Sequence, residues 1–317
     1  MRAVQHAREL RPRVVRHAEI AKAERVLVCC ARNEMPRFPS FLRHYRKLGI
    51  DHFIVIDNQS TDGLEEYLAA QPDASVWRAE GSYKRSNFGM DWCNHLLNRH
   101  CSGKWCVTVD PDELLVYPYC EDRDLRSLTA YMTSVGQQAL FTVLVDAYGR
   151  GRLSETQLTP DGDPFTICPH FDRFNLTQRF DPRYQNFWIQ GGVRMRRFFP
   201  SDPMKAPALN KVPLVKWRRG LYYISSMHHL NDPTLNCTVR TDHRAVSGVL
   251  LHFKYLSLLR HKAEEEMQRK EHYAGSVEYK AYLGAGDPVL YDAEVSLEYT
   301  GSRVFEEHGF MQAGGWF

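Results

Sequence analysis

Short runs of apolar residues alternate with amphipathic stretches along the first 110 residues of the chain. Three runs are apolar almost throughout, which is typical of parallel strands that are buried on both faces. They are RVLVCCA at 25–31, IDHFIVID at 50–57 and WCVTV at 105–109. Residues 36–48 instead repeat large apolar side chains at helical spacing, and Gly49 follows as a stop signal. Residues 87–98 also have apolar side chains at helical spacing. The pattern therefore predicts strands that alternate with helices.

This alternation is the βαβ rhythm of an open, mostly parallel twisted sheet with helices on both faces. The rhythm weakens after about residue 135, although QALFTVLVDAY at 138–148 predicts one more strand and residues 256–272 predict a strongly charged helix. We therefore expect an α/β fold in three parts. They are a basic N-terminal segment (1–24), a first half (25–135) and an elaborated second half of the same domain (136–317).

Composition and charge narrow the class of protein. The chain has 43% hydrophobic and 25% charged residues, as globular proteins do, and a formal net charge of +3. No long run of one sign accompanies this small charge, so we expect no nucleic-acid partner. No apolar stretch approaches the ~20 residues that span a bilayer. The eight cysteines contain no CxxC pair, which indicates reduced cysteines in a cytoplasmic protein.

The first 16 residues carry five arginines. No apolar segment follows them, so we expect an exposed basic helix or tail rather than a secretory signal peptide. The alternative is an electrostatic contact with anionic lipids, which would place the protein peripherally at the inner face of the membrane.

Polar side chains follow each of the three predicted strands. In open α/β sheets, ligands bind beyond the carboxyl ends of the strands, so these side chains should meet at one edge. The three groups are Arg32, Asn33 and Glu34, then Asp57 and Asn58, then Asp110 and Asp112.

The third group lies in VTVDPDELLVYP at 107–118. Asp110 and Asp112 are spaced i and i+2 around Pro111, directly after a buried strand. A pair of hard oxygen ligands at a sheet edge suits Mg²⁺ or Mn²⁺ bound together with a diphosphate. The alternative is a solvated acidic turn, since Asp-x-Asp alone is common. The two other polar strand ends favour the metal site.

These motifs, in their order and spacing, resemble glycosyltransferases of the family-2-like GT-A group. The matching segments are RNE at 32–34, HYRKLGIDHFIVIDNQSTDG at 44–63 and VDPDE at 109–113. The resemblance implies a GT-A fold, a UDP- or GDP-sugar donor in the first half, and a divalent cation on Asp110 and Asp112. It further implies that Asp57 contacts the base or ribose, although Asn58 stands where many relatives have a second Asp.

For function, the resemblance implies that the protein transfers a sugar, with inversion, to a glycan or lipid-linked acceptor in cell-envelope polysaccharide biosynthesis. Arg32, Asn33 and Glu34 would then line the nucleotide pocket. Their alternative roles are loop capping and surface ion pairing. Arg85 precedes a predicted helix, whose N-terminus favours anions, and is a further candidate for donor contacts.

The second half offers candidates for the acceptor or a phosphate. Gly191 and Gly192 permit close approach of a ligand to the backbone. Arg194 can bind an oxyanion through two parallel hydrogen bonds, and Lys211 precedes a basic, aromatic stretch. The alternative is a glycine turn beside a strand edge lined by arginine.

Asp110 and Asp112 supply too few ligands for an octahedral cation. A late histidine would complete the shell. His252 is the first choice because it ends the apolar run GVLLH, and His228, which follows LYYISS, is the second. The alternative for either is a hydrogen-bonded structural role. Asp172 is the candidate for the general base that takes the proton of the acceptor hydroxyl, although Asp146 and Asp202 are not separated from it by any local pattern.

Two other functions share the predicted sheet. A nucleotidyltransferase that makes sugar nucleotides should carry a glycine-rich basic loop after the first strand, whereas this chain has ARNEMPRF at 31–38. A binding module without activity would not need Asp110 and Asp112, which are both intact.

Overall fold

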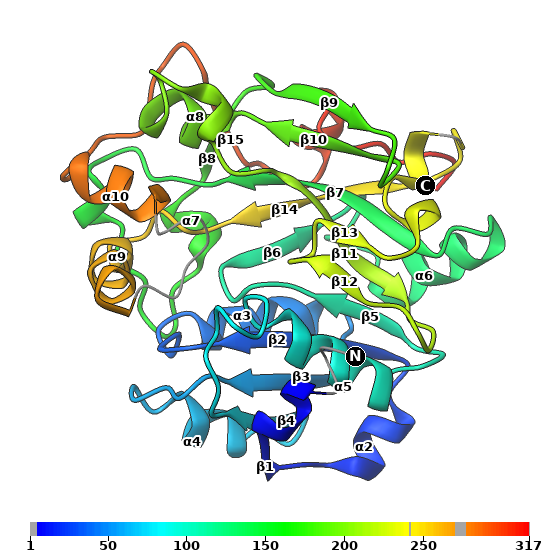
Figure 1. The fold of residues 1–317 in the computed structure, drawn as a ribbon. Helices are drawn as coiled ribbons and strands as arrows, with labels where there is room; N and C mark the ends of the chain where they lie inside the picture. The colour runs from blue at the N-terminus through cyan, green and yellow to red at the C-terminus, as the bar shows by residue number, and fades with distance from the viewer. Residues whose placement is uncertain (1–4, 241, 270–276, 317) are drawn as a thin grey trace.

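The computed structural model describes residues 5–240, 242–269 and 277–316. Within these residues the fold is built on one nine-stranded sheet in the order β1-β4-β3-β2-β5-β11-β7-β14-β6 (Figure 1). Its strands are β1 (Leu10–Val14), β2 (Arg25–Ala31), β3 (His52–Asp57), β4 (Ala74–Ala79), β5 (Trp105–Thr108), β6 (Glu113–Val116), β7 (Ala139–Asp146), β11 (Asn210–Lys216) and β14 (Ser247–His252).

The sheet has a parallel part and a mixed part. Strands β4, β3, β2 and β5 run parallel, as the apolar runs predict. Strand β11 then runs antiparallel to both β5 and β7. Strand β14 is parallel to β7 and antiparallel to β6. The predicted α/β fold on an open, twisted sheet is confirmed, and strands of the second half extend the sheet of the first.

Apolar side chains alternate between two cores, one on each face of the sheet. Leu27 and Cys29 of β2 join the core covered by α3 (Phe38–Lys47), α4 (Leu64–Ala69) and α6 (Leu125–Ser134). Val26 and Val28 join the core covered by α2 (His17–Lys22) and α5 (Met90–His100). The prediction of helices on both faces is therefore confirmed, and the continuous apolar run of β2 follows from burial on both sides.

The N-terminal segment is not the exposed helix or tail that its charge predicted. Strand β1 pairs antiparallel with β4 and closes that edge of the sheet. Arg13 Nε lies 2.6 Å from Glu65 Oε1, and Arg16 donates to the backbone oxygens of Ala69 and Ala74. Because these arginines contact the protein itself, the arrangement lends no support to a membrane contact. None of the described helices is long and apolar enough to cross a membrane.

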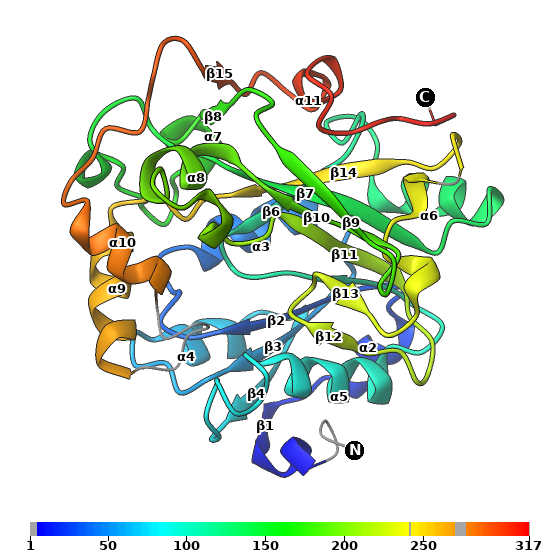
Figure 2. The same cartoon turned by 45° about the horizontal axis from the view of Figure 1, so that its top comes forward.

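The second half adds short elements around the sheet. Helices α9 and α10 follow the carboxyl end of β14 and lie at that end of the sheet in both views (Figures 1 and 2). The elements are α7 (Pro164–Ile167), β8 (His170–Asp172), β9 (Thr177–Asp181), β10 (Asn186–Gln190), α8 (Gly192–Phe198), β12 (Tyr223–Ser225), β13 (His229–Leu230), α9 (Leu258–Arg269), α10 (Val277–Gly284), β15 (Ser296–Glu298) and α11 (Arg303–Glu307).

Candidate functional site

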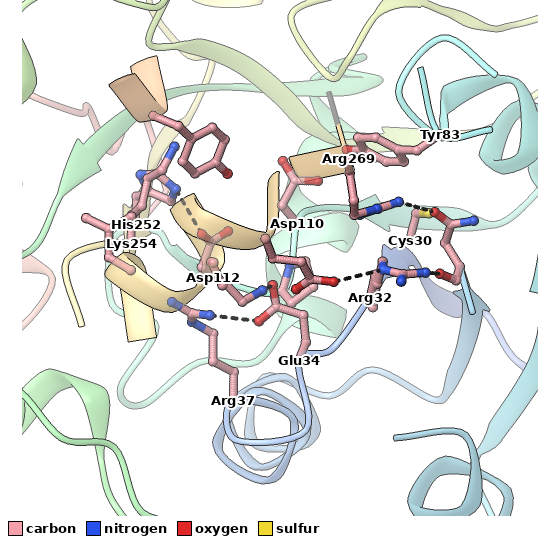
Figure 3. Close-up of a pocket in the computed structure, with 17 residues that line it drawn as sticks. Cys30, Arg32, Glu34, Arg37, Tyr83, Asp110, Asp112, His252, Lys254 and Arg269 are labelled. Atoms are coloured by element: carbon pink, nitrogen blue, oxygen red, sulfur yellow. Dashed lines mark hydrogen bonds and ion pairs between the residues drawn. The ribbon is translucent and has the colours of Figure 1, made fainter. Parts of the chain in front are cut away.

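A cavity of about 910 Å³, including its open part, lies at the carboxyl ends of β2, β3, β5 and β14 (Figure 3). Helices α9 and α10 form its opposite wall. Its lining residues are Cys30, Ala31, Arg32, Glu34, Arg37, Asn58, Tyr83, Asp110, Pro111, Asp112, His252, Lys254, Leu259, Lys262, Glu265, Arg269 and Tyr279. The strand ends thus converge at one edge of the sheet, where open α/β sheets bind their ligands.

Six of the predicted site residues line this cavity. They are Arg32, Glu34, Asn58, Asp110, Asp112 and His252. They come from four strand ends, and His252 is separated by about half the chain from the acidic pair. The structure therefore brings the polar strand ends and one late histidine to a single place.

The acidic loop connects β5 to β6 and is held from both sides. The backbone N–H of Asp110 donates to Glu113 Oε2 at 3.2 Å. The N–H of Phe253 donates to the backbone oxygen of Asp112 at 2.8 Å, which ties the loop to the end of β14. Lys211 Nζ lies 2.8 Å from Glu113 Oε1 and 3.6 Å from Asp110 Oδ2. Lys211, predicted to contact an anionic ligand, is buried here and neutralises the acidic loop.

Asp110 and Asp112 have opposite electrostatic properties. Burial and the neighbouring Glu113 raise the pKa of Asp110 to about 7, although Lys211 opposes them. Burial also raises the pKa of Asp112, but His252 outweighs it and holds that pKa well below the usual range. Asp112 is therefore ionised at neutral pH, as a metal ligand must be, whereas Asp110 is partly protonated in the metal-free protein.

His252 is held between two carboxylates. Its Nε2 lies 3.3 Å from Asp112 Oδ2 (Figure 3). Its Nδ1 lies 2.6 Å from Asp146 Oδ1. Burial lowers the pKa of His252, but Asp112 and Asp146 outweigh burial and raise it to about 9. With a proton on Nδ1 shared with Asp146, Nε2 faces Asp112. A carboxylate that orients a histidine in this way is the usual second shell of a metal-binding imidazole.

Arg194 is not available for the phosphate or acceptor contact that its sequence context suggested. Its guanidinium binds Asp146 through Nε and Nη2, at 2.7 and 2.6 Å, and its side chain is 4% exposed. This buried pair fixes Asp146, which in turn fixes His252. The sequence indicates a role for Asp146 at this edge of the sheet, because Asp146 ends the apolar run of β7 just as Asp110 follows that of β5.

We expect Arg194→Met to destabilise the protein by about 3–5 kcal/mol, since it removes both guanidinium hydrogen bonds of the buried Asp146 carboxylate and leaves it only His252. Equilibrium unfolding in urea would measure the change. Arg197→Met is the matched control, because Arg197 lies on the same helix, α8, and is exposed. Equal stability of the two variants would show that the buried pair contributes little.

The residues present fit a divalent cation only in company with a substrate. Among the described residues, no group of three His, Cys, Asp or Glu side chains is arranged to hold a metal ion. Asp112 and His252 offer one oxygen and one nitrogen ligand, and the remaining positions would need diphosphate oxygens and water. Such a shared shell matches the chemistry of Mn²⁺ or Mg²⁺ bound with a diphosphate.

The loop after β2 is tied to both β3 and α9. Arg32 Nη1 donates to the backbone oxygens of Asn58 and Gln59, at 2.8 and 3.0 Å. Glu265 of α9 accepts hydrogen bonds from Arg32 Nε and Asn33 Nδ2, at 3.2 and 2.9 Å. Sequence reasoning missed Glu265, since charged residues on a helix usually indicate a solvated face.

Asp57 lies one position away from the cavity wall. It is fully buried, accepts hydrogen bonds from the backbone N–H of Ser60 at 3.2 Å, and is not a lining residue. Its neighbour Asn58 lines the cavity and is contacted by Arg269 Nη2 at 3.4 Å. Asp57 thus shapes the turn that presents Asn58.

The remaining predicted residues do not line the cavity. His228 Nδ1 is bonded to the backbone oxygen of Asn210 at 2.6 Å. Asp172 is buried and binds Arg196 through both carboxylate oxygens, at 2.8 and 2.9 Å. The N–H of Gly192 donates to Asn175 Oδ1, which fixes the start of α8. Outside the cavity as well are Gly191 and the exposed Arg85.

Comparison with protein-family models and with curated proteins finds no match to this chain. Solved structures similar to part of it include the mannosyltransferase PcManGT from Pyrobaculum calidifontis, in complex with GDP-Man and Mn²⁺. The two are 17% identical, with 47% of this chain and 41% of that chain covered and a TM-score of 0.25. Another is glucosyl-3-phosphoglycerate synthase from Mycobacterium tuberculosis, in complex with Mn²⁺ and UDP. It is 21% identical to this chain, with 44% of this chain and 49% of that chain covered and a TM-score of 0.24.

A third similar structure is 4-diphosphocytidyl-2C-methyl-D-erythritol synthase, at 14% identity, with 41% of this chain and 64% of that chain covered and a TM-score of 0.27. The chain spans less than two thirds of the length of each of these three proteins. At such identities and TM-scores these likenesses carry no argument about what the protein does.

Proposed function

We propose that this protein is a metal-dependent glycosyltransferase of the GT-A type. It would transfer a sugar, with inversion, from a UDP- or GDP-sugar to a glycan or lipid-linked acceptor. The observation that carries the proposal is the Asp112–His252 pair, 3.3 Å apart at the carboxyl ends of the sheet and supported by Asp146. This pair needs diphosphate oxygens to complete a cation shell, which is what a nucleotide-sugar donor brings.

The cavity provides for both parts of such a donor. Cys30, Asn58, Tyr83 and Arg269 line the side at β2 and β3, where a nucleoside would lie. The diphosphate would then reach Asp112 and His252. A cation bound there would neutralise the charge of the departing nucleoside diphosphate. Asp110, between the two sides, would accept a hydrogen bond from the ribose or join the cation shell.

A nucleotidyltransferase is the alternative enzyme. It would bind a nucleoside triphosphate and a sugar phosphate, and it would cradle the triphosphate with a glycine-rich loop after the first strand. Here that loop contains Glu34, bonded to Arg37 at 2.8 Å, and no glycine. A loop without glycine is less able to wrap its backbone N–H groups around a triphosphate, so the cavity favours the donor of a glycosyltransferase.

The first test is nucleotide binding by thermal shift, with UDP, GDP and CDP, each with and without Mn²⁺. We expect one nucleoside diphosphate to raise the melting temperature, and to do so strongly only when Mn²⁺ is present, because cation and diphosphate bind as one unit. A parallel reaction of a nucleoside triphosphate with sugar 1-phosphates should release no pyrophosphate. Release of pyrophosphate would overturn the proposal in favour of nucleotidyl transfer.

Metal binding should strengthen as the pH rises. In the metal-free protein at neutral pH, His252 is in its doubly protonated, cationic form, because its pKa of about 9 lies above the ordinary value of about 6.5. The cation must displace one of these protons, so the apparent Mn²⁺ affinity in the presence of nucleotide should rise by up to about tenfold per pH unit between pH 7.5 and 8.5. Calorimetric titrations would measure it. Asp110, with a pKa of about 7, adds to the slope only at lower pH. A flat profile over this interval would contradict the assignment of His252.

A further inference from the structure

Arg37 is a buried guanidinium with few protein partners. It ends the turn that leads into α3, where it is the N-cap residue, and is 3% exposed. Among the described residues, its hydrogen-bonding partner is Glu34, reached from Nη1 at 2.8 Å, and its Nε is buried without a partner. A guanidinium has five N–H donors, and leaving buried donors unsatisfied is unfavourable. The side chain points into the cavity (Figure 3). A planar set of donors in this state matches an oxyanion.

The surroundings of Arg37 carry surplus positive charge. Glu34 is shared by two cations, because Lys262 of α9 also donates to it. Lys254 also lines the cavity, with its Nζ 3.0 Å from Glu278 and 5.0 Å from the centre of the Tyr279 ring. Glu278 also lies 4.0 Å from Arg194 Nη1, but Arg194 is already paired with Asp146. Glu34 alone therefore offsets only part of the charge of Arg37 and Lys262.

Arg37 and Lys254 face the same space. Burial lowers the pKa of Arg37, and Asp112 and Tyr279 partly offset this effect. Arg37, Lys254 and Tyr279 all line the cavity. Tyr279 is the ring under Lys254, and Lys254 also acts on Asp112. In Figure 3, Arg37, Lys254 and His252 lie on one side of Asp110, whereas Arg269, Tyr83 and Cys30 lie on the other.

This arrangement divides the cavity. If the nucleoside occupies the side of Arg269, Tyr83 and Cys30, its diphosphate ends at Asp112 and His252. The space beside Arg37 and Lys254 then lies beyond the diphosphate, on the side that the second substrate has to enter. An oxyanion bound there would belong to that second substrate.

We propose that the acceptor carries a phosphate or carboxylate group, and that Arg37 and Lys254 bind this group. The inference rests on the proposed function for the identity of the two substrates, but the anion site itself is defined by Arg37, Lys254 and Lys262. It makes an anionic acceptor, such as a sugar phosphate or an acidic sugar, a better substrate than its neutral analogue. Arg37 would orient the acceptor through two parallel hydrogen bonds, as guanidinium groups do with oxyanions.

The test is a calorimetric titration of inorganic phosphate into the full chain saturated with Mg²⁺ and the nucleoside diphosphate that it binds. We expect phosphate to bind the wild type and to bind at least about tenfold more weakly to Arg37→Gln. Arg37→Lys keeps the positive charge beside Glu34. Its affinity for phosphate should lie between those of the wild type and Arg37→Gln. Arg43→Gln is the matched control, since Arg43 is an exposed residue of the same helix that donates to the backbone oxygens of Pro160 and Gly162.

The nucleoside diphosphate serves as the internal reference. Its affinity should be the same in wild type, Arg37→Gln and Arg43→Gln, which also shows that the variants are folded. A tenfold loss of this affinity in Arg37→Gln would assign Arg37 to the donor diphosphate and overturn the inference. Absence of phosphate binding, or equal phosphate binding in all variants, would overturn it as well. If no nucleotide binds the wild type, the proposed function fails, and the same titration of the nucleotide-free protein still decides whether the anion site exists.

Discussion

Replacing Asp112 with asparagine is expected to lower kcat/KM for sugar transfer by about 10³-fold or more, with little change in the stability of the fold. The carboxylate is ionised and lies beside His252 at the point where the diphosphate would arrive. Charge neutralisation by a bound cation is worth several kcal/mol in the transition state, and about 4 kcal/mol corresponds to 10³-fold in rate. Asparagine retains the shape of the side chain but is a much weaker ligand. Donor-dependent transfer assays at saturating Mn²⁺ would measure the loss.

The matched control is Asp122→Asn, an exposed carboxylate outside the cavity on the chain that follows β6. It should keep wild-type kcat/KM. Transfer by Asp112→Asn within tenfold of wild type at ordinary Mn²⁺ concentrations would show that Asp112 is not a metal ligand. It would also remove the observation on which the proposed function depends.

The side of the cavity formed by β2, β3 and β5 was predictable because it depends on local sequence. Strands β2, β3 and β5 are apolar along their whole length, and the residues that follow them must lie at one edge of a parallel sheet. Asn58 and Asp112 line the cavity for this reason. The contact predicted between Asp57 and a base or ribose stays a prediction; in this structure the carboxylate accepts from the backbone N–H of Ser60, and Asn58 rather than Asp57 lines the cavity.

The contacts that the second half of the chain makes around the cavity were less predictable because they join distant parts of the chain. Arg194 and Asp146 are 48 residues apart, and Asn33 and Glu265 are 232 apart, so no local pattern connects them. Without its partner in view, Arg194 resembles an arginine available to a ligand. Strand β1 was missed for another reason. Its short sequence contains Pro12 and two arginines, which suit a sheet edge but hide the strand.

Replacing His252 with alanine should raise the Mn²⁺ concentration needed for half-maximal activity by at least about 100-fold. Mutating a residue that only orients a ligand costs 10- to 100-fold in metal affinity, and loss of the ligand itself should cost no less. The same variant should bind the nucleoside diphosphate more weakly when Mn²⁺ is present and equally well when it is absent, because His252 acts on the nucleotide only through the cation.

His228→Ala separates this effect from the general loss of a late histidine. His228 is bonded to the backbone oxygen of Asn210 and does not line the cavity, so its removal should leave the Mn²⁺ requirement unchanged. Manganese titrations of both variants, followed by transfer rate and by nucleotide affinity, would compare the two histidines directly. Equal, wild-type requirements in both would mean that water completes the cation shell and that the contact of His252 with Asp112 is structural. If His228→Ala alone needed more Mn²⁺ for activity, the cation would have to bind near His228 rather than at the end of β14.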